Sequence, residues 1–296
     1  MSRKENLISE LHPRKGTWKI AVCITDMWDV KKHNGRQAID MVLIDQMGVK
    51  IGATLWQELF PEFQPKLTLG CSYLIQNIKV VDNQSEYKVS PIPYLLYFVK
   101  TTSVKEVERL EIPANVHVIT EIADIISGIA PRHTLVDFVG VVAEVIERKI
   151  VNPAYKVTVK LRDNSDAEIL MTLWEDYALQ LDDAIEKNHF VRESLVLMLT
   201  LAKIKDAKGE YNYPLSVQNI KNGSKLYVNS DDIAEIRKFR DSLCVPFYVG
   251  GLTEEGSGSQ SQYTSNSQRG DRDKFLHNAQ MTSLGDISRL REWMKS

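Results

Sequence analysis

Alternating hydrophobic and polar positions divide most of this chain into short strands. In the first hundred residues, such runs predict strands at 18–25, 38–45, 49–56, 71–80 and 87–89. Asn-Gly and Met-Gly pairs supply turns, and a helical pattern favours a short helix after the third strand, at residues 58–63. Two prolines, Pro91 and Pro93, are expected to interrupt regular structure after the fifth strand.

The same order of elements returns further along the chain. Strands are predicted at 136–146, 156–161, 169–174, 195–204 and 215–217, with a helix at 177–187. A loop containing Arg148, Lys149 and Pro153 is expected between the first two of these strands. Five short strands with a helix after the third are typical of a small, partly open Greek-key barrel, the OB-fold.

A sequence repeat supports two copies of one domain. Residues 43–56 read LIDQMGVKIGATLW and residues 161–174 read LRDNSDAEILMTLW, which align without a gap and share Leu, Asp, Ile and Thr-Leu-Trp. Asp45 therefore matches Asp163, and Trp56 matches Trp174. The spacing is too long for a solenoid repeat and suits a small domain.

These patterns predict a mainly β protein with two tandem OB-fold barrels of five strands each, short helices and a partly disordered C-terminal tail. We expect the domains at residues 1–110 and 111–230. Residues 231–296 are expected to hold a helix, then a Gly-, Ser- and Gln-rich linker that cannot order itself. A short amphipathic helix follows, with Leu284, Ile287, Leu290 and Trp293 along one face.

Composition narrows the class of protein. Apolar residues make up 43% of the chain, as in ordinary globular proteins, and no apolar run is long enough for a membrane span. Three widely spaced cysteines argue against a disulfide framework and a zinc site, and no cofactor is expected. The known catalytic motifs are absent, so we expect no enzyme.

Charge is distributed unevenly although the net charge is only −2. Residues 1–110 carry 15 Lys and Arg against 12 Asp and Glu, whereas residues 111–230 carry 13 against 17. Basic side chains gather in the first inter-strand loop, at Lys31, Lys32 and Arg36. Arg148 and Lys149 occupy the matching place in the second copy.

Aromatic residues beside these basic loops suggest a surface for unpaired nucleic acid, which needs stacking platforms for bases and cations for phosphates. The candidates are Trp56 and Trp174 at the ends of the third strands, Tyr87 and Tyr211 beside the next hairpin, and Trp28 next to the basic loop. A tryptophan in a barrel strand is also compatible with a place in the core.

Several segments resemble the large subunit of replication protein A, the eukaryotic single-strand DNA-binding factor. The matching segments, which fall in the right order, are Gly16–Ile20, Ala53–Trp56, Leu135–Gly140, Thr172–Asp176 and Leu215–Val217. The resemblance covers about residues 10–230, corresponds to the two central DNA-binding OB domains, and is strongest to short plant-type relatives.

The resemblance implies that Trp56, Tyr87 and Trp174 stack on bases. The fourth stacking position falls at Glu210, where the adjacent Tyr211 could substitute. Gly52 stands where the family has a basic residue, which implies a weaker or altered first site. The resemblance also implies a nuclear protein of DNA replication, repair or recombination.

The sequence lacks the zinc-ribbon and trimerisation region of the family, which argues against a heterotrimer with the smaller subunits. The predicted function is single-stranded DNA binding without catalysis. Two alternatives remain open: single-stranded RNA binding, and a protein-interaction scaffold that uses the barrels or the helix at 284–293. No membrane partner is expected.

Overall fold

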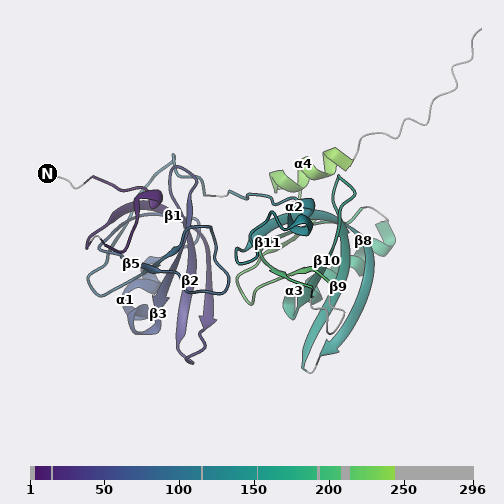
Figure 1. Ribbon diagram of the computed structural model, residues 1–296, viewed down its shortest axis with the longest axis horizontal. Coiled ribbons are helices and arrows are strands. Elements are labelled where there is room, and N and C mark those ends of the chain that lie inside the picture. The colour runs from purple at the N-terminus through teal and green to yellow at the C-terminus, as the bar shows by residue number, and fades with distance from the viewer. Residues whose placement is uncertain are drawn as a thin grey trace, which may run out of the picture. The chain divides into compact units, whose positions relative to one another are not determined.

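The computed structural model describes residues 4–14, 16–114, 116–151, 153–191, 194–207 and 214–243, except for the side chains of residues 189–191. All of these residues belong to one compact unit, Met1–Pro246. The linker and amphipathic helix expected in the C-terminal tail lie outside the described residues, as do Glu210 and Tyr211. Figure 1 shows the strands of each half as a separate curved sheet, one in purple and blue and one in teal and green.

Seven strands form the first sheet, in the order β5-β6-β3-β2-β1-β4-β7. Their bounds are β1 Lys19–Lys31, β2 Gln37–Ile44, β3 Lys50–Trp56, β4 Ser72–Gln76, β5 Lys79–Asp82, β6 Tyr94–Tyr97 and β7 Ser103–Glu106. β4 pairs with β1, and β5 pairs with β6, which lies parallel to β3. The segment from β4 to β5 therefore runs from one side of the sheet, next to β1, to the other side, next to β6, and the strand is broken between them.

Asn77 lies at this break in the strand. It has a φ of +57°, and its N–H donates to the Trp18 carbonyl at 2.9 Å. An asparagine tolerates the left-handed region better than most residues. The single strand predicted at 71–80 is therefore wrong in its middle, although both of its halves are strands.

The second sheet has the order β12-β10-β9-β8-β11-β13, and an additional pairing of β12 with β11 closes the barrel. Its strands are β8 Val136–Val151, β9 Ala154–Arg162, β10 Glu168–Trp174, β11 Val196–Lys205, β12 Ser216–Gln218 and β13 Leu226–Val228. Here β11 continues through the corresponding turn, with a register shift between Leu199 and Ala202. Five principal strands, with added edge strands, make each barrel.

Short helices cover the open parts of the barrels. They are η1 Ile8–Glu10, η2 Gln57–Leu59, α1 Phe60–Phe63, η3 Gln64–Lys66, α2 Ile122–Ser127, α3 Asp176–Val191 and α4 Ala234–Leu243. Ile122 and Ile125 of α2 join the core of the second barrel, so this part of the connecting segment packs there. No helix in the described ranges is long and apolar enough to cross a membrane.

Two further predictions are wrong in detail. The strand expected at 87–89 is reduced to a bridge between Lys88 and Thr134, and the last barrel strand is instead β6. It begins at Tyr94 because Pro93 has no N–H to donate to a ladder. The loop expected to contain Arg148 and Lys149 is also wrong, because β8 continues to Val151 and pairs Lys149 with Lys156.

The repeated aspartate explains why the two copies fold alike. Asp45 is buried, and its Oδ1 accepts N–H bonds from Met47 and Val49 at 2.9 and 3.1 Å, while its Oδ2 accepts from Ile8 at 2.8 Å. Asp163 likewise accepts from Ser165 and Ala167 at 2.9 and 3.1 Å. Each carboxylate thus closes the turn before the strand that ends in a tryptophan.

Replacing Asp45 with alanine should lower the free energy of unfolding by about 2–4 kcal/mol, because one buried and two part-buried N–H groups lose a charged acceptor. Chemical denaturation of the full chain measures this change. Gln46→Ala, in the same turn but exposed, is the control and should change stability by less than about 0.5 kcal/mol. Equal effects of the two substitutions would contradict the role assigned to the carboxylate.

Candidate nucleic-acid interface

Trp56 lies at the outer end of β3, half-buried and outside the core cluster of the first barrel. The guanidinium of Arg36 lies over its ring, 4.4 Å from the centroid. Tyr97 of β6 meets the same ring edge-on, with centroids 5.9 Å apart and planes at 73°. A partly exposed indole bordered by a cation and a second aromatic can accept a flat, electron-rich ring.

The turn after β1 brings Arg36 to this place. Gly35 has a φ of +78°, and its N–H donates to the Lys32 carbonyl at 2.8 Å, which closes the turn predicted from Asn-Gly. Arg36 then reaches Glu58, with Nη2 2.7 Å from Oε1. The hydrogen bond from Arg36 lowers the pKa of Glu58, so this carboxylate stays charged beside the indole.

The other predicted cations of this loop differ in their surroundings. Lys32 Nζ lies 2.6 Å from Asp40 Oδ2, and Asp40 also accepts a bond from Thr54. Lys31 is the last residue of β1 rather than a loop residue, and its side chain is exposed. Two of the three candidate cations are therefore already paired with carboxylates of the chain.

Trp174 holds the same place in the second barrel, at the end of β10. The backbone N–H of Trp174 donates to Asn219 Oδ1 at 2.9 Å, which links the strand end to the segment after β12. Lys156 Nζ lies 5.9 Å from its ring centroid and 2.7 Å from Glu147 Oε2. Bonding to Lys156, and more weakly the charge of Lys149, lowers the pKa of Glu147.

Both barrels thus present a strand-end triplet, which we define as an indole, a cation over its ring and a carboxylate bound to that cation. The first triplet is Trp56, Arg36 and Glu58; the second is Trp174, Lys156 and Glu147. The tryptophans correspond in the repeat, but the cations do not, since Arg36 comes from a turn and Lys156 from β9. Spatial convergence from different sequence positions points to a shared chemical task.

A hollow of about 280 Å³ adjoins Trp174. Lys203 and Lys221 line it together with the carboxylates of Glu175 and Asp176 and the amide side chains of Gln218, Asn219 and Asn222. Lys221 Nζ lies 3.6 Å from Glu175 Oε2. Burial, and then the nearby charge of Lys205, lower the pKa of Lys203. The ammonium of Lys203 and the amides can bond an anionic or carbonyl oxygen, whereas the two carboxylates oppose an anion there.

Arg148 and Lys149 point to different surroundings although they are neighbours in β8. Lys149 is largely exposed, with Nζ 3.7 Å from Glu147. Arg148 contacts α3 instead, with Nε 2.7 Å from Asp182 Oδ1 and Nη1 3.0 Å from Glu186 Oε1. Only Lys149 of this pair is placed on the side of the second triplet.

Tyr87 and Trp28 belong to neither triplet. Both pack against an apolar cluster that includes Val42, Leu135 and Leu201. The hydroxyl of Tyr87 accepts a bond from Lys205 Nζ at 2.9 Å, and that ammonium also lies 5.1 Å from the ring centroid. Trp28 belongs to β1, rather than to the basic loop, and is half-buried.

The glycine that departs from the family pattern is matched by its surroundings. A Cβ at Gly52 would lie 2.9 Å from Leu95 Cδ1 and 3.5 Å from Val89 Cγ2. A longer side chain needs Leu95 to move, and Leu95 pairs with Gly52 in the β3–β6 ladder. Leu95 therefore occupies the space that a longer side chain at position 52 would need.

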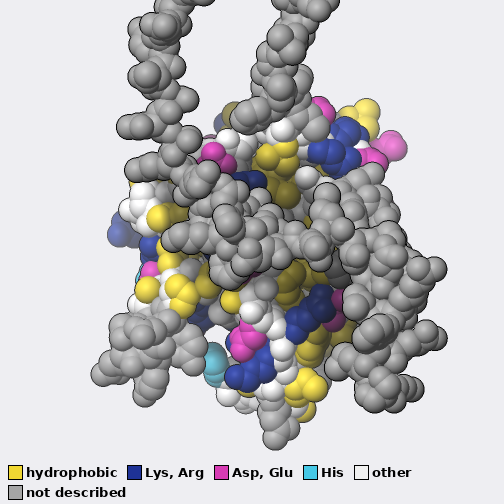
Figure 2. Space-filling view, turned by 90° about the vertical axis from the view of Figure 1, so that its right-hand side faces the viewer, with side chains coloured by type: hydrophobic (Ala, Val, Ile, Leu, Met, Phe, Trp, Pro, Cys, Tyr) yellow, Lys and Arg dark blue, Asp and Glu magenta, His cyan; other side chains and the backbone are white. Residues whose placement is uncertain are grey.

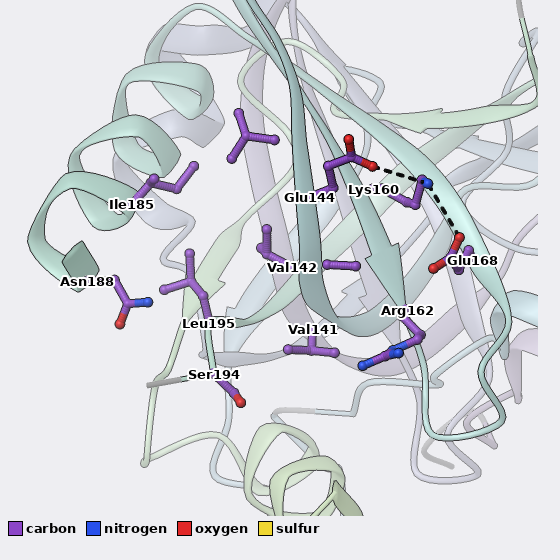
Figure 3. A pocket seen from close by; sticks show the side chains of 12 residues that line it. Val141, Val142, Glu144, Lys160, Arg162, Glu168, Ile185, Asn188, Ser194 and Leu195 are labelled. Carbon is purple, nitrogen blue, oxygen red and sulfur yellow. Dashed lines mark ion pairs between the residues drawn. The ribbon is translucent and has the colours of Figure 1, made fainter. Parts of the chain in front are cut away.

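A hollow elsewhere on the second barrel has a different character. It measures about 530 Å³ and lies between β8, β9 and the end of α3, and in it Lys160 bonds Glu144 and Glu168 at 3.3 and 3.6 Å (Figure 3). Its charges are neutralised locally, and neither strand-end tryptophan lines it. Figure 2 shows one face of the molecule, on whose coloured part basic, acidic and apolar side chains are interspersed without a large single-sign area.

Three residues of the interface escaped sequence reasoning: Tyr97, Lys156 and Lys203. Lys156 stands directly opposite Trp174 in the β9–β10 ladder, so the register of the repeated hairpin could have revealed it. Tyr97 follows two prolines and was hidden by the misplaced fifth strand. Among the described residues, no group of three or more His, Cys, Asp and Glu side chains is placed to hold a metal ion.

The sequence is similar to those of several known proteins. A family model described as "Domain of unknown function DUF223" matches residues 9–128. Two replication protein A 70 kDa DNA-binding subunits, one from Oryza sativa subsp. japonica and one from Arabidopsis thaliana, are 26% and 25% identical, each over 79% of this chain. The chain is similar to these large subunits of replication protein A over most of its length.

A solved structure supports the fold of this chain. The structure titled "Structure and Conformational Change of a Replication Protein A Heterotrimer Bound to ssDNA" matches 80% of this chain and 54% of its own chain, with a TM-score of 0.50 and 21% identity. The two tandem OB-fold barrels are thereby confirmed. The chain spans 37% of the length of both the rice and the Arabidopsis relative.

The two strand-end tryptophans should be dispensable for folding. Trp56→Ala should cost clearly less stability than Leu55→Ala, because Leu55 is fully buried and its truncation leaves a core cavity worth about 2–5 kcal/mol. Thermal and chemical unfolding of both variants measure the difference. A Trp56→Ala variant that unfolds as readily as Leu55→Ala would make this tryptophan a core residue.

Proposed function

We propose that this protein binds single-stranded DNA through the two strand-end triplets. The observation that carries the proposal is the recurrence of an indole, a cation and a carboxylate at the same end of both barrels. Stacking on aromatic side chains and contact with phosphates are the two requirements of binding without base readout. The relatives named as DNA-binding subunits favour the same polymer.

The triplets suggest how binding proceeds. A base stacks on Trp56 or Trp174, and a phosphate takes the place of Glu58 or Glu147 as partner of the cation. The ion pair between the cation and its carboxylate is then replaced by one between the cation and the phosphate. The lost ion pair offsets part of the favourable free energy of the new one. Exposed surface pairs contribute about 0–1 kcal/mol, so a phosphate competes with them readily.

Two modest sites on one chain bind more tightly than either alone. Once one triplet holds the strand, the other meets it at the effective concentration set by the tether. Each stacked base contributes about 1–3 kcal/mol. Further cations are Lys203 and Lys221, which line the hollow beside Trp174, and Lys149, which is paired with Lys156 in the β8–β9 ladder. Lys31 is exposed at the end of β1.

The remaining candidate residues belong to the same proposal in different ways. Tyr87 and Tyr211 are proposed as additional stacking residues, and Trp28 as a neighbour of Tyr87 in its apolar cluster. Tyr87 must leave part of this cluster to expose its ring. The function is proposed to be non-enzymatic and to serve DNA replication, repair or recombination in the nucleus.

Single-stranded RNA is the alternative ligand, since the triplets do not distinguish the sugars. Fluorescence anisotropy with an oligomer of about 30 nucleotides tests the proposal, using single-stranded DNA, single-stranded RNA and duplex DNA. Preference for single-stranded DNA supports it. Binding to none of the three would leave the barrels as a protein-interaction scaffold and reject the proposal.

Trp56→Ala and Trp174→Ala should each weaken binding of single-stranded DNA by about fivefold to a hundredfold, because each removes one stacking platform. Affinity should also fall steeply between about 50 and 200 mM salt as phosphate contacts release counterions. Lys187→Ala, an exposed change on α3, serves as the control and should leave affinity within about twofold. Unchanged affinity in both tryptophan variants would reject the triplets as the site.

Glu58→Gln should strengthen binding by about twofold to fivefold at low salt, because it releases Arg36 for phosphate. Glu62→Gln removes the same charge from an exposed position of α1 without contacting Arg36, and is the matched control. Titration of both variants at two salt concentrations separates local release from a general change in charge. Equal gains from the two would show that Glu58 has no specific role.

A further inference from the structure

The hairpin of β8 and β9 continues well past the barrel that it belongs to. Side chains from Val142 to Val151 are all partly or fully exposed, and Ile150 is 73% exposed. Register shifts between Val142 and Glu144 and between Val145 and Glu147 bend this part of the ladder. Core burial therefore does little to fix this outer part of the hairpin. The same part carries Lys156, which lies over the ring of Trp174, and Lys149, which is paired with Lys156.

Contacts with one helix hold this hairpin instead. Arg148 of β8 lies 2.7 Å from Asp182 and 3.0 Å from Glu186, which are one turn apart on α3. Tyr155 of β9 donates its hydroxyl to Asp182 Oδ2 at 2.9 Å. Asp182 thus contacts both strands of the hairpin, and Glu186 adds a second contact to β8.

The chemistry of Asp182 makes this fastening specific. Its Oδ1 is buried and accepts no hydrogen bond from the described residues, so the guanidinium of Arg148 is what compensates its charge. A buried carboxylate oxygen without such a partner is costly. Partial burial, and then the neighbouring Asp182, raise the pKa of Tyr155, so its hydroxyl keeps its proton as a donor.

The opposite face of the same strands carries the second triplet. Successive side chains of a strand point to opposite faces. Arg148 and Tyr155 therefore face α3, while their neighbours Lys149 and Lys156, which are paired across the ladder, face the other way. There Lys156 meets Glu147 and lies over the ring of Trp174.

We propose that Arg148, Tyr155 and Asp182 form a positioning clamp that holds Lys149 and Lys156 beside Trp174. Arg148 then acts through the hairpin and is not itself a phosphate ligand. The proposal rests on the proposed function in one respect, namely that the face carrying Trp174 binds single-stranded DNA. The clamp itself is a structural property of the hairpin that can be measured without DNA.

The two roles of Arg148 predict opposite effects when Asp182 is neutralised. If Arg148 contacted phosphate, Asp182→Asn would release it and remove a repelling charge, so binding would strengthen. If Arg148 positions the hairpin, Asp182→Asn loosens Lys149 and Lys156 and binding weakens in spite of the lost negative charge. The sign of the change in affinity therefore decides between them.

The test compares Asp182→Asn with Asp183→Asn in the full chain. Asp183 is the next residue of α3 and pairs only with exposed Lys187 among the described residues, so the second variant removes the same charge without touching the hairpin. Asp182→Asn should bind single-stranded DNA about threefold to tenfold more weakly than Asp183→Asn. Amide hydrogen exchange in residues 146–151 and 154–156 should become faster in Asp182→Asn alone.

Two further outcomes keep the failures apart. Equal or tighter binding by Asp182→Asn, with unchanged exchange in the hairpin, would overturn the clamp. If the unaltered protein binds no single-stranded DNA, the proposed function fails, and the exchange comparison still decides whether the clamp exists. Should Asp182→Asn not fold, Tyr155→Phe removes one hydroxyl, and unaltered exchange in residues 154–156 of that variant would overturn the clamp.

Discussion

A buried carboxylate at the turn of one hairpin sets the geometry on which each triplet depends. Asp45 and Asp163 hold the turns that lead into β3 and β10, and the register of those strands follows from the turns. Because side chains alternate along a strand, a slip of one residue would bury Trp56 and expose Leu55. The core and the candidate interface are therefore specified by the same few hydrogen bonds.

The electrostatics of the surface follow a different logic from that of strongly basic nucleic-acid binders. The chain has a net charge of −2, and most cations of the candidate interface already have a carboxylate partner. A negatively charged ligand must exchange with these carboxylates rather than fill an open basic groove. Such an arrangement suppresses non-specific attraction to duplex DNA, which depends on uncompensated positive charge.

The sequence predicted the two barrels and the position of Trp56 and Trp174 at the ends of their strands. It did not predict the break in the first barrel or the directions of the basic side chains in β8. The duplication identified Asp45, Trp56 and their counterparts because a shared spacing survives divergence. The break at Asn77 depends on one residue with positive φ, which no hydrophobic pattern reveals. Arg148 and Lys149 point in opposite directions because they are neighbours in a strand, where side chains alternate between faces. The sequence predicted a loop there, so this alternation was not expected.

The cations of the two triplets differ in how firmly the backbone holds them. Arg36 extends from a tight turn, whereas Lys156 belongs to the ladder of β9 and stands across from Trp174. A turn side chain can swing away from its ring on a faster timescale than a side chain rooted in a paired strand. A bound polymer would then detach more often at the first barrel than at the second. Under the proposed function, this asymmetry would make the first barrel the end at which a bound strand is released first.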